Sequence, residues 1–161
     1  MLLYRIANAR YADDLSGNGA RLYGGRWNSE GKPMVYLASS RSLAVLESLA
    51  HFIPTNIPDD FVMLTIEAPD DFLAVPENVL PDNWNEYPEQ HILKQIGNSF
   101  LQRNEHLLLK VPSALVPEEF NYLLNPSHPK ARKVKIIKKS PFNFDERLVE
   151  ASPKSSPKER I

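Results

Sequence analysis

The sequence predicts a single α+β domain in which short strands are interspersed with two helices. Its 161 residues are enough for one domain with a core that needs no disulfide or metal. Strand-like segments outnumber helical ones and do not alternate regularly with them. No G-x-G-x-x-G or P-loop lysine motif follows a strand, which argues against a doubly wound dinucleotide-binding sheet.

Two segments carry helical signals. The first is SSRSLAVLESLAHFIP, in which Ser40 can cap the start of a helix and Pro54 ends the helix. An apolar stripe along this helix begins at Leu43. The second is YPEQHILKQIGNSFLQRN, residues 87–104, with Pro88 near its first turn.

The strands are predicted from short apolar or alternating runs bounded by turn residues. They cover residues 2–7, 34–39, 61–69, 106–112, 120–125 and 131–139. Residues 8–33 and 70–84 show no sustained periodicity and are expected to be loops. The Ser/Pro/Lys-rich segment 150–161 is expected to be a disordered tail, which leaves residues 1–149 as the domain.

Composition excludes several classes of protein. The chain has no cysteine, which removes disulfides, thiolate metal sites and a cysteine nucleophile. A formal net charge of −1 gives no general attraction to nucleic acid, and no segment reaches the ~20 apolar residues of a membrane span. The N-terminus lacks the pattern of a signal peptide, so a cytoplasmic protein is expected. The histidines show no metal-ligand spacing, and they stand at positions 51, 91, 106 and 128.

The stretch GARLYGGRWNSEGKPMVYLASS, residues 19–40, holds four of the chain's six glycines. Glycine lets a ligand approach the backbone closely, and Arg26 in this stretch offers a planar cation suited to phosphate. The alternative is an ordinary solvated loop arginine. The combination favours a ligand that carries phosphate.

Tyr36 and Glu47 follow directly along the chain. Tyr36 alternates with Val35 and Leu37, so it faces the opposite side of its strand and is either a core tyrosine or a surface for stacking a heterocycle. Glu47 projects about 40° from Leu43 on the helix, which places a carboxylate beside the apolar stripe. It is either a surface carboxylate or a desolvated acid. Together with Arg26 they suit a nucleotide whose glycosidic bond is broken.

Two further features have simple explanations. Ser113 has no nucleophile-elbow setting, so a hydrogen-bonding residue at the end of a strand is favoured over a hydrolase nucleophile. The basic segment Lys130–Lys139 is interpreted as an edge strand protected by lysines rather than as a nucleic-acid face.

The sequence also resembles a known family. GGRWN, the spacing from Tyr36 to Glu47, and VPSA followed by NYLLNP are similar to motifs of the RES-domain family, and the match runs from about residue 3 to residue 148. The resemblance implies an ADP-ribosyltransferase-like mixed sheet and the toxin of a toxin–antitoxin pair. Its partner would be an Xre-like helix-turn-helix antitoxin that covers the active site, and the resemblance allows a homodimer within that complex.

The resemblance further implies that NAD⁺ is consumed as a substrate, with no cofactor, by cleavage of the nicotinamide–ribose bond. Arg26, Tyr36 and Glu47 map onto the catalytic residues. Ser113 maps onto the NAD⁺-binding site together with Arg26 and Tyr36, and Arg5 is a further contact.

The chemistry of these residues agrees with that implication. Nicotinamide leaves as a neutral molecule, so the reaction needs stabilisation of a ribosyl oxocarbenium, which a fixed carboxylate such as Glu47 supplies. Tyr36 would stack on nicotinamide, Arg26 would hold the pyrophosphate or ribose side, and Ser113 would orient the nicotinamide.

The acceptor of the ADP-ribose stays open. Water or phosphate would make the chain a glycohydrolase or phosphorylase, and a cellular protein would make it a mono-ADP-ribosyltransferase. A nucleotide-binding module without turnover and a purely structural protein are the alternatives from other classes.

Overall fold

The computed structural model describes residues 1–51 and 60–149. One mixed sheet of seven strands, in the order β4-β5-β6-β2-β1-β3-β7, forms its centre. All neighbouring strands are antiparallel except β4 and β5, which are parallel. The strands are β1 (Leu2–Asn8), β2 (Val35–Ala38), β3 (Phe61–Glu67), β4 (Phe72–Ala74), β5 (Leu108–Pro112), β6 (Phe120–Leu124) and β7 (Lys135–Phe142). The α+β class predicted from the sequence is confirmed.

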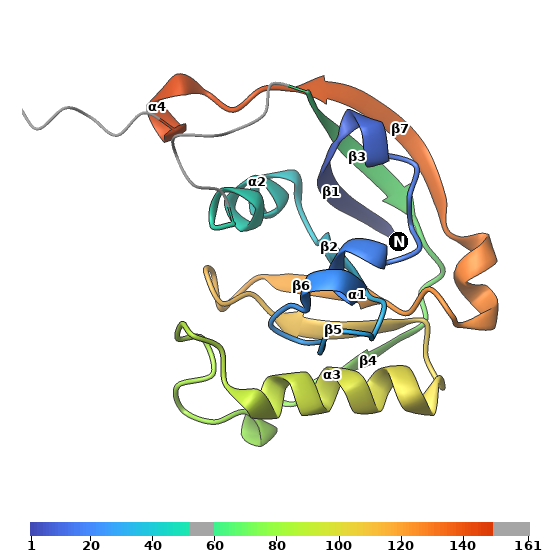
Figure 1. Cartoon of the computed structure of the whole chain (residues 1–161), viewed down its shortest axis with the longest axis vertical. Helices are drawn as coiled ribbons and strands as arrows, with labels where there is room; N and C mark the ends of the chain where they lie inside the picture. Colours follow the sequence, from blue (N-terminus) through green and yellow to red (C-terminus); the bar gives the residue numbers. More distant parts are fainter. Residues whose placement is uncertain (52–59, 150–161) are drawn as a thin grey trace, which may run out of the picture.

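The sheet consists of two halves that meet between β1 and β2. This junction has a single paired position, Tyr4 with Ala38, whereas β1 pairs with β3 along its whole length. In Figure 1 the strands β1 and β3 run steeply, while β5 and β6 lie almost across the view. The weak pairing at the junction permits this change of direction within one sheet.

Helices cover one face of both halves. The described helices are α1 (Asn18–Tyr23), α2 (Arg41–Leu49), α3 (His91–Arg103) and α4 (Glu146–Val149), with short 3₁₀ segments at Ala9–Tyr11, Glu77–Val79 and Pro129–Lys133. Helix α2 packs on β1, β2 and β3 through Leu43 and Ala44, and α3 packs on β5 and β6 through Leu93 and Phe100. The opposite face carries a separate apolar cluster that includes Leu3, Leu37 and Leu64.

The predicted helices are both present, with different ends. The hydroxyl of Ser40 accepts a hydrogen bond from Leu43 N at 3.1 Å, so the predicted N-cap of α2 is confirmed. Helix α2 ends at Leu49, and the predicted end at Pro54 lies outside the described residues. Helix α3 begins at His91, three residues after Pro88, because Gln90 still has extended backbone angles.

Two predicted loops contain secondary structure. Residues 8–33 include α1, a six-residue helix that follows Gly17 at φ 72° and is too short to show an apolar periodicity. Residues 70–84 include β4, which adds three exposed residues to the edge of the sheet by pairing with β5. A strand this short is fixed by its partner rather than by its own pattern.

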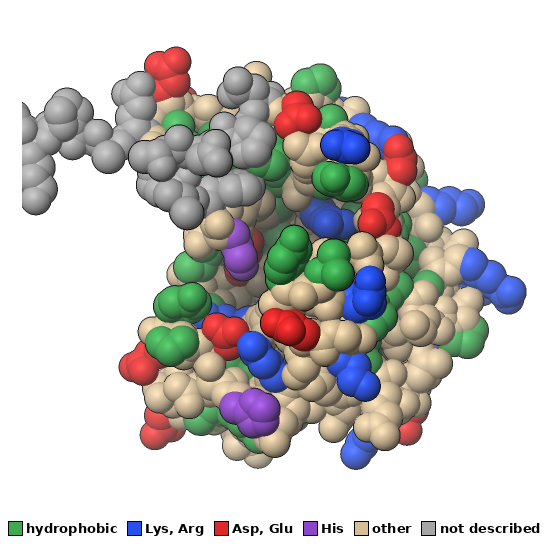
Figure 2. Space-filling view, in the orientation of Figure 1, with side chains coloured by type: hydrophobic (Ala, Val, Ile, Leu, Met, Phe, Trp, Pro, Cys, Tyr) green, Lys and Arg blue, Asp and Glu red, His purple; other side chains and the backbone are tan. Residues whose placement is uncertain are grey.

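The predicted lysine-protected edge strand is confirmed from Lys135 onward, whereas Lys130–Lys133, predicted as part of it, belong to a 3₁₀ segment. Strand β7 is the last strand of the sheet, and its exposed side chains include Lys135, Lys138 and Lys139. Figure 2 shows Lys and Arg side chains along this side of the molecule. Such charges oppose pairing of the open edge with another chain. The predicted tail, 150–161, lies outside the described residues.

Candidate active site

Two polar side chains that are distant from Glu47 in the chain meet at its carboxylate. One carboxylate oxygen, Oε1, accepts a hydrogen bond from the Ser113 hydroxyl at 2.7 Å and another from Asn121 Nδ2 at 2.6 Å. Ser113 is fully buried and Glu47 is half-buried. The structure therefore brings together two residues that the sequence predicted for the site, Glu47 and Ser113, and adds a third, Asn121.

Helix α2 aims Glu47 at this cluster. The Ser40 cap fixes the start of the helix, and Leu43 and Ala44 are buried against the sheet. Glu47 lies one turn after Leu43, so its side chain projects from the same side of the helix. The predicted position beside the apolar stripe is confirmed. Leu46, an apolar residue of the same helix, is 43% exposed.

The register of the central strands places Tyr36 on the same face. Asn121 of β6 stands opposite Ala38 of β2, and Leu123 stands opposite Tyr36. Side chains of directly opposed residues share a face of the sheet, and residues two apart on a strand do as well. Ala38, which stands opposite Asn121, is two positions from Tyr36 on β2. The side chains of Tyr36 and Asn121 therefore lie on the same face of the sheet.

The hydroxyl of Tyr36 is held inside the protein. It donates a hydrogen bond to Asn28 Oδ1 at 2.7 Å and accepts one from Trp27 N at 3.0 Å. Burial raises the pKa of Tyr36 well above its usual value, against the opposing effect of the Trp27 N–H. The prediction that Tyr36 faces the side of β2 opposite to Val35 and Leu37 is confirmed. Tyr36 packs against the apolar residues between α3 and the sheet, and Val35 and Leu37 pack on the other face. The ring is half-buried, and its stacking role stays a prediction.

Asn28 organises the glycine-rich stretch around Tyr36. Its side chain is fully buried, and Nδ2 donates to the carbonyl oxygens of Ala20, Ser29 and Lys32. Gly25 passes so close that a β-carbon there would lie 2.6 Å from the Tyr36 hydroxyl oxygen. One role of the glycines is therefore internal packing, which the sequence pattern alone did not indicate.

Arg26 is attached to a neighbouring loop. Its Nη1 donates hydrogen bonds to the carbonyl oxygens of Trp84 and Glu86, both at 3.0 Å. These two bonds use both N–H donors of Nη1. The other guanidinium nitrogens, Nη2 and Nε, bond to none of the described residues. Arg26 thus fastens the loop before α3, and its predicted contact with NAD⁺ stays a prediction.

The structure does not bring Arg5 to this cluster. Tyr4 and Ala38 share the face that carries Tyr36, so Arg5, the next residue of β1, projects from the opposite face. There its Nη1 donates to the carbonyl oxygen of Asp14 at 3.2 Å. Burial lowers the pKa of Arg5, and the nearby charge of Asp14 opposes this effect.

A cavity lies at the end of β5. It has a volume of about 310 Å³ and lies between the loop fastened by Arg26, represented by Leu80 and Trp84, and the end of β5 at Pro112. Pro112 immediately precedes Ser113. Figure 2 shows the molecule hollowed on this face between the part with α2 and the part with α3. Glu47, Ser113 and Asn121 do not line this cavity.

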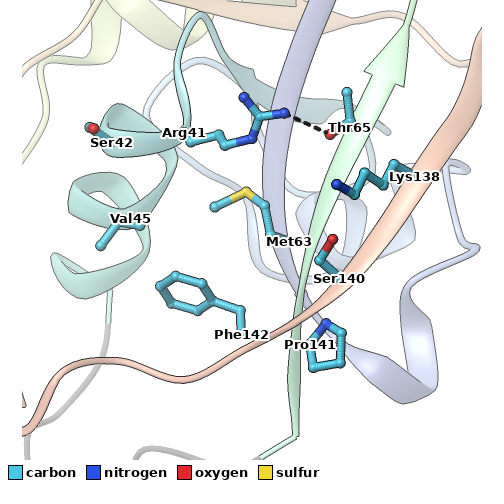
Figure 3. A pocket seen from close by; sticks show the side chains of 9 residues that line it. All are labelled: Arg41, Ser42, Val45, Met63, Thr65, Lys138, Ser140, Pro141 and Phe142. Carbon is cyan, nitrogen blue, oxygen red and sulfur yellow. Dashed lines mark hydrogen bonds between the residues drawn. The ribbon is translucent and has the colours of Figure 1, made fainter.

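A second cavity, of about 290 Å³, lies beside α2 (Figure 3). Its floor consists of the opposed pairs Thr65–Lys138 and Met63–Ser140 of β3 and β7. Arg41 reaches over it, 4.4 Å from the ring centre of Tyr4 and 3.4 Å from the Thr65 hydroxyl. None of the residues predicted for the site lines this cavity.

The described residues contain no group of three or more His, Asp or Glu side chains that could hold a metal ion. His51 Nδ1 lies 2.7 Å from the carbonyl oxygen of Glu47, and His106 pairs with Asp71. Within the same residues no helix has the length and apolar character needed to cross a membrane.

Comparison with known proteins identifies the family. The model of the RES domain matches residues 2–145. This chain belongs to the RES-domain family. The predicted family is therefore confirmed, and Glu47, Ser113 and Asn121 all lie within the matched residues of the RES domain.

Curated relatives of this RES protein are named as toxins. It is 42% identical over 142 residues to the Prs ADP-ribosylating toxin of a Sphingobium species, covering 86% of this chain and 88% of the relative. It is 39% identical over 154 residues to Toxin Res of Photorhabdus laumondii, covering 94% and 99%. Toxin Res of Pseudomonas putida is 41% identical over 150 residues, covering 92% and 99%. The chain thus groups with the RES toxins.

A solved structure has the same fold. The chain resembles one from the MbcT–MbcA toxin–antitoxin complex of M. tuberculosis, with a TM-score of 0.71, 22% identity, and coverage of 88% of this chain and 83% of the other. The ADP-ribosyltransferase-like fold that the sequence resemblance implied is confirmed.

Proposed function

We propose that this RES protein is the toxin of a toxin–antitoxin pair and that it cleaves the bond between nicotinamide and ribose in NAD⁺. The observation that carries the proposal is the carboxylate of Glu47, held by hydrogen bonds from Ser113 and Asn121. Fixed donors around a carboxylate are typical of a site that must present charge in one place.

The reaction separates charge in a way that Glu47 can support. As the bond from nicotinamide N1 to ribose C1′ breaks, its electron pair leaves with nicotinamide, which becomes neutral. Positive charge then develops on C1′ and the ring oxygen, as in glycoside hydrolysis. A carboxylate fixed nearby stabilises that charge without moving. No general acid is needed, because the leaving group takes no proton.

Water completes the hydrolysis. Its oxygen forms the new bond to C1′ and its proton passes to Glu47 or to solvent, which gives ADP-ribose. Phosphate in place of water would give the phosphorylated product. Tyr36 would stack on nicotinamide, and Nη2 and Nε of Arg26, which bond to none of the described residues, would hold the ribose or pyrophosphate. These last two roles rest on the placement of Tyr36 and Arg26 around the same face.

Transfer of ADP-ribose to a protein is the second candidate. It is favoured by the name of the 42% identical Sphingobium relative, the Prs ADP-ribosylating toxin. The chemistry up to the oxocarbenium is the same, and a nucleophilic atom of the acceptor protein takes the place of water.

An antitoxin is proposed as the protein partner. The similar chain of known structure comes from a complex of a toxin with its antitoxin. We propose that an Xre-like antitoxin covers the face that carries Glu47, and that the pair acts in the cytoplasm.

The test uses NAD⁺ labelled in its ADP-ribose part. The wild type, Glu47→Gln and the control Glu105→Gln, an exposed glutamate, are incubated with it in buffer and in cell lysate. We expect nicotinamide from the wild type and the control, and a rate about 10²–10³-fold lower from Glu47→Gln. Free ADP-ribose supports hydrolysis and a labelled protein band supports transfer. A wild type that releases no nicotinamide excludes both, and equal rates for all three remove Glu47 from the mechanism.

A further inference from the structure

We propose that Asn121 is a positioning residue, which acts on the reaction by holding the carboxylate of Glu47, and that Ser113 is its partner in this task. The inference rests on the proposed function, because it concerns the same carboxylate. Its physical basis is the pair of short hydrogen bonds to Glu47 Oε1, at 2.6 Å from Asn121 and 2.7 Å from Ser113.

Both donors bind the same oxygen of the carboxylate. Oε1 receives the two bonds, whereas Oε2 receives none from the described residues. Two donors that bind one oxygen, one from strand β6 and one from the residue that follows β5, restrict rotation of the carboxylate about its last bond. Oε2 is thus presented in a fixed direction with its lone pairs available. This is the oxygen that we assign to the developing charge on ribose C1′.

The hydroxyl of Ser113 has no second proton to offer. It donates its one hydrogen to Glu47, and its oxygen accepts hydrogen bonds from Leu115 N and Val116 N, each at 3.1 Å. A hydroxyl has one donor and two acceptor positions, so all of them are in use. Ser113 therefore acts through Glu47, in place of the predicted hydrogen bond to nicotinamide.

Asn121 is anchored more firmly than a surface amide. Its strand, β6, pairs on one side with β2, where Asn121 faces Ala38, and on the other with β5, where it faces Val111. The backbone of Asn121 is thus fixed from both sides. The amide of Asn121 must turn its NH₂ group, and not its oxygen, towards Glu47, because only the NH₂ group can donate to a carboxylate. The amide ties helix α2 to the centre of the sheet.

The identity of residue 121 as an amide matters. An aspartate of the same shape would place a second carboxylate against Oε1, and two carboxylates that close share a proton. Glu47 would then lose part of its negative charge at the pH where the enzyme works. Alanine would only remove one donor. The two replacements therefore have different effects if Asn121 holds Glu47.

The experiment measures kcat and KM for nicotinamide release over a range of pH. It compares the wild type with Asn121→Ala, Asn121→Asp and the control Asn78→Asp, which makes the same chemical change at an exposed position. For Asn121→Ala we expect kcat to fall about 10- to 100-fold, as for other residues that orient a reactive group, with KM within about twofold. For Asn121→Asp we expect the acid limb of the kcat profile to move to higher pH, and for the control no change.

Each other result contradicts the inference. A raised KM with unchanged kcat in Asn121→Ala would show that Asn121 contacts NAD⁺ directly. An unaltered pH profile in Asn121→Asp would show that residue 121 does not face Glu47, and this variant keeps the shape of the side chain if the alanine variant fails to fold. No nicotinamide from the wild type overturns the proposed function and this inference with it, whereas normal release by both Asn121 variants overturns the inference alone.

Discussion

Gly97 of helix α3 lies directly against the backbone of Trp27, and a β-carbon at residue 97 would overlap the Trp27 carbonyl oxygen. Gly97 is buried in the middle of the helix, where glycine is otherwise unfavourable. Trp27 is the neighbour of Arg26. The close approach therefore seats the glycine-rich stretch on α3 and contributes to placing Arg26.

We expect Gly97→Ala to destabilise the protein. The overlap involves backbone rather than the end of a flexible side chain, so helix and loop must separate, at a cost of about 1–3 kcal/mol. Gly19→Ala is the matched control, since nothing lies within 4 Å of a β-carbon there and residue 19 belongs to α1. Alanine in a helix gains up to ~1 kcal/mol over glycine, so the control is neutral or stabilised. Urea unfolding measures both, and equal midpoints would contradict the packing described.

Tyr36→Phe should also lower stability, with a dependence on pH. The change leaves Asn28 Oδ1 and Trp27 N without their partner, which costs about 1–3 kcal/mol. Since burial raises the pKa of Tyr36 in the folded state, the wild type loses stability as pH rises above ~10, where the unfolded tyrosine ionises. Phenylalanine does not ionise, so Tyr36→Phe should lose less stability than the wild type over this alkaline range. Tyr23→Phe, at an 82% exposed residue, is the control, and identical unfolding curves from pH 7 to 11 would refute the prediction.

Asp71 should contribute to stability in acid. It accepts hydrogen bonds from Lys130 Nζ at 2.7 Å and His106 Nδ1 at 2.9 Å, and these partners lower its pKa to about 2. Because the folded pKa lies below the unfolded one, the stabilisation is present above pH ~4 and is lost as pH falls towards 2. We expect the wild type to lose on the order of 1–2 kcal/mol more than Asp71→Asn over this interval. Chemical unfolding between pH 5 and 2 tests this, with Asp82→Asn, an exposed aspartate, as the control.

Arg26→Ala should loosen the loop that precedes α3. The two bonds from Nη1 to the carbonyl oxygens of Trp84 and Glu86 are lost, so the backbone of this loop opens more often. Hydrogen exchange at the amides of these two residues should rise, while exchange in the central strands stays unchanged. Arg21→Ala is the control, because the described bonds of that side chain go to Asn18 within α1. Unchanged exchange in Arg26→Ala would exclude a role in fastening the loop.

The local features of the fold could be predicted from the sequence because they depend on neighbouring residues. The Ser40 cap, the inward direction of Glu47 and the face of β2 on which Tyr36 lies all follow from the spacing of residues within a few positions. The edge position of β7 follows from its lysines.

What the sequence could not show depends on contacts across the chain. Strand β4 exists because β5 lies beside it, and Arg26 is fastened by carbonyl groups of a loop with no sequence signal for them. Asn121 could have been noticed as a polar residue within an apolar strand. Its partner could not, because the bond to Glu47 depends on how α2 lies across the sheet.

The separation of these partners in the chain also decides when the site around Glu47 can form. Glu47 is 66 residues from Ser113 and 74 from Asn121. During synthesis, the segment with Arg26, Tyr36 and Glu47 emerges well before Ser113 and Asn121, which hold the carboxylate in place. Long-range pairings form late, because loop closure must precede them. A nascent chain would thus complete the arrangement around Glu47 only after β6 has been made and has paired with β2, so the activity proposed for this site would depend on nearly the whole matched RES domain having been synthesised.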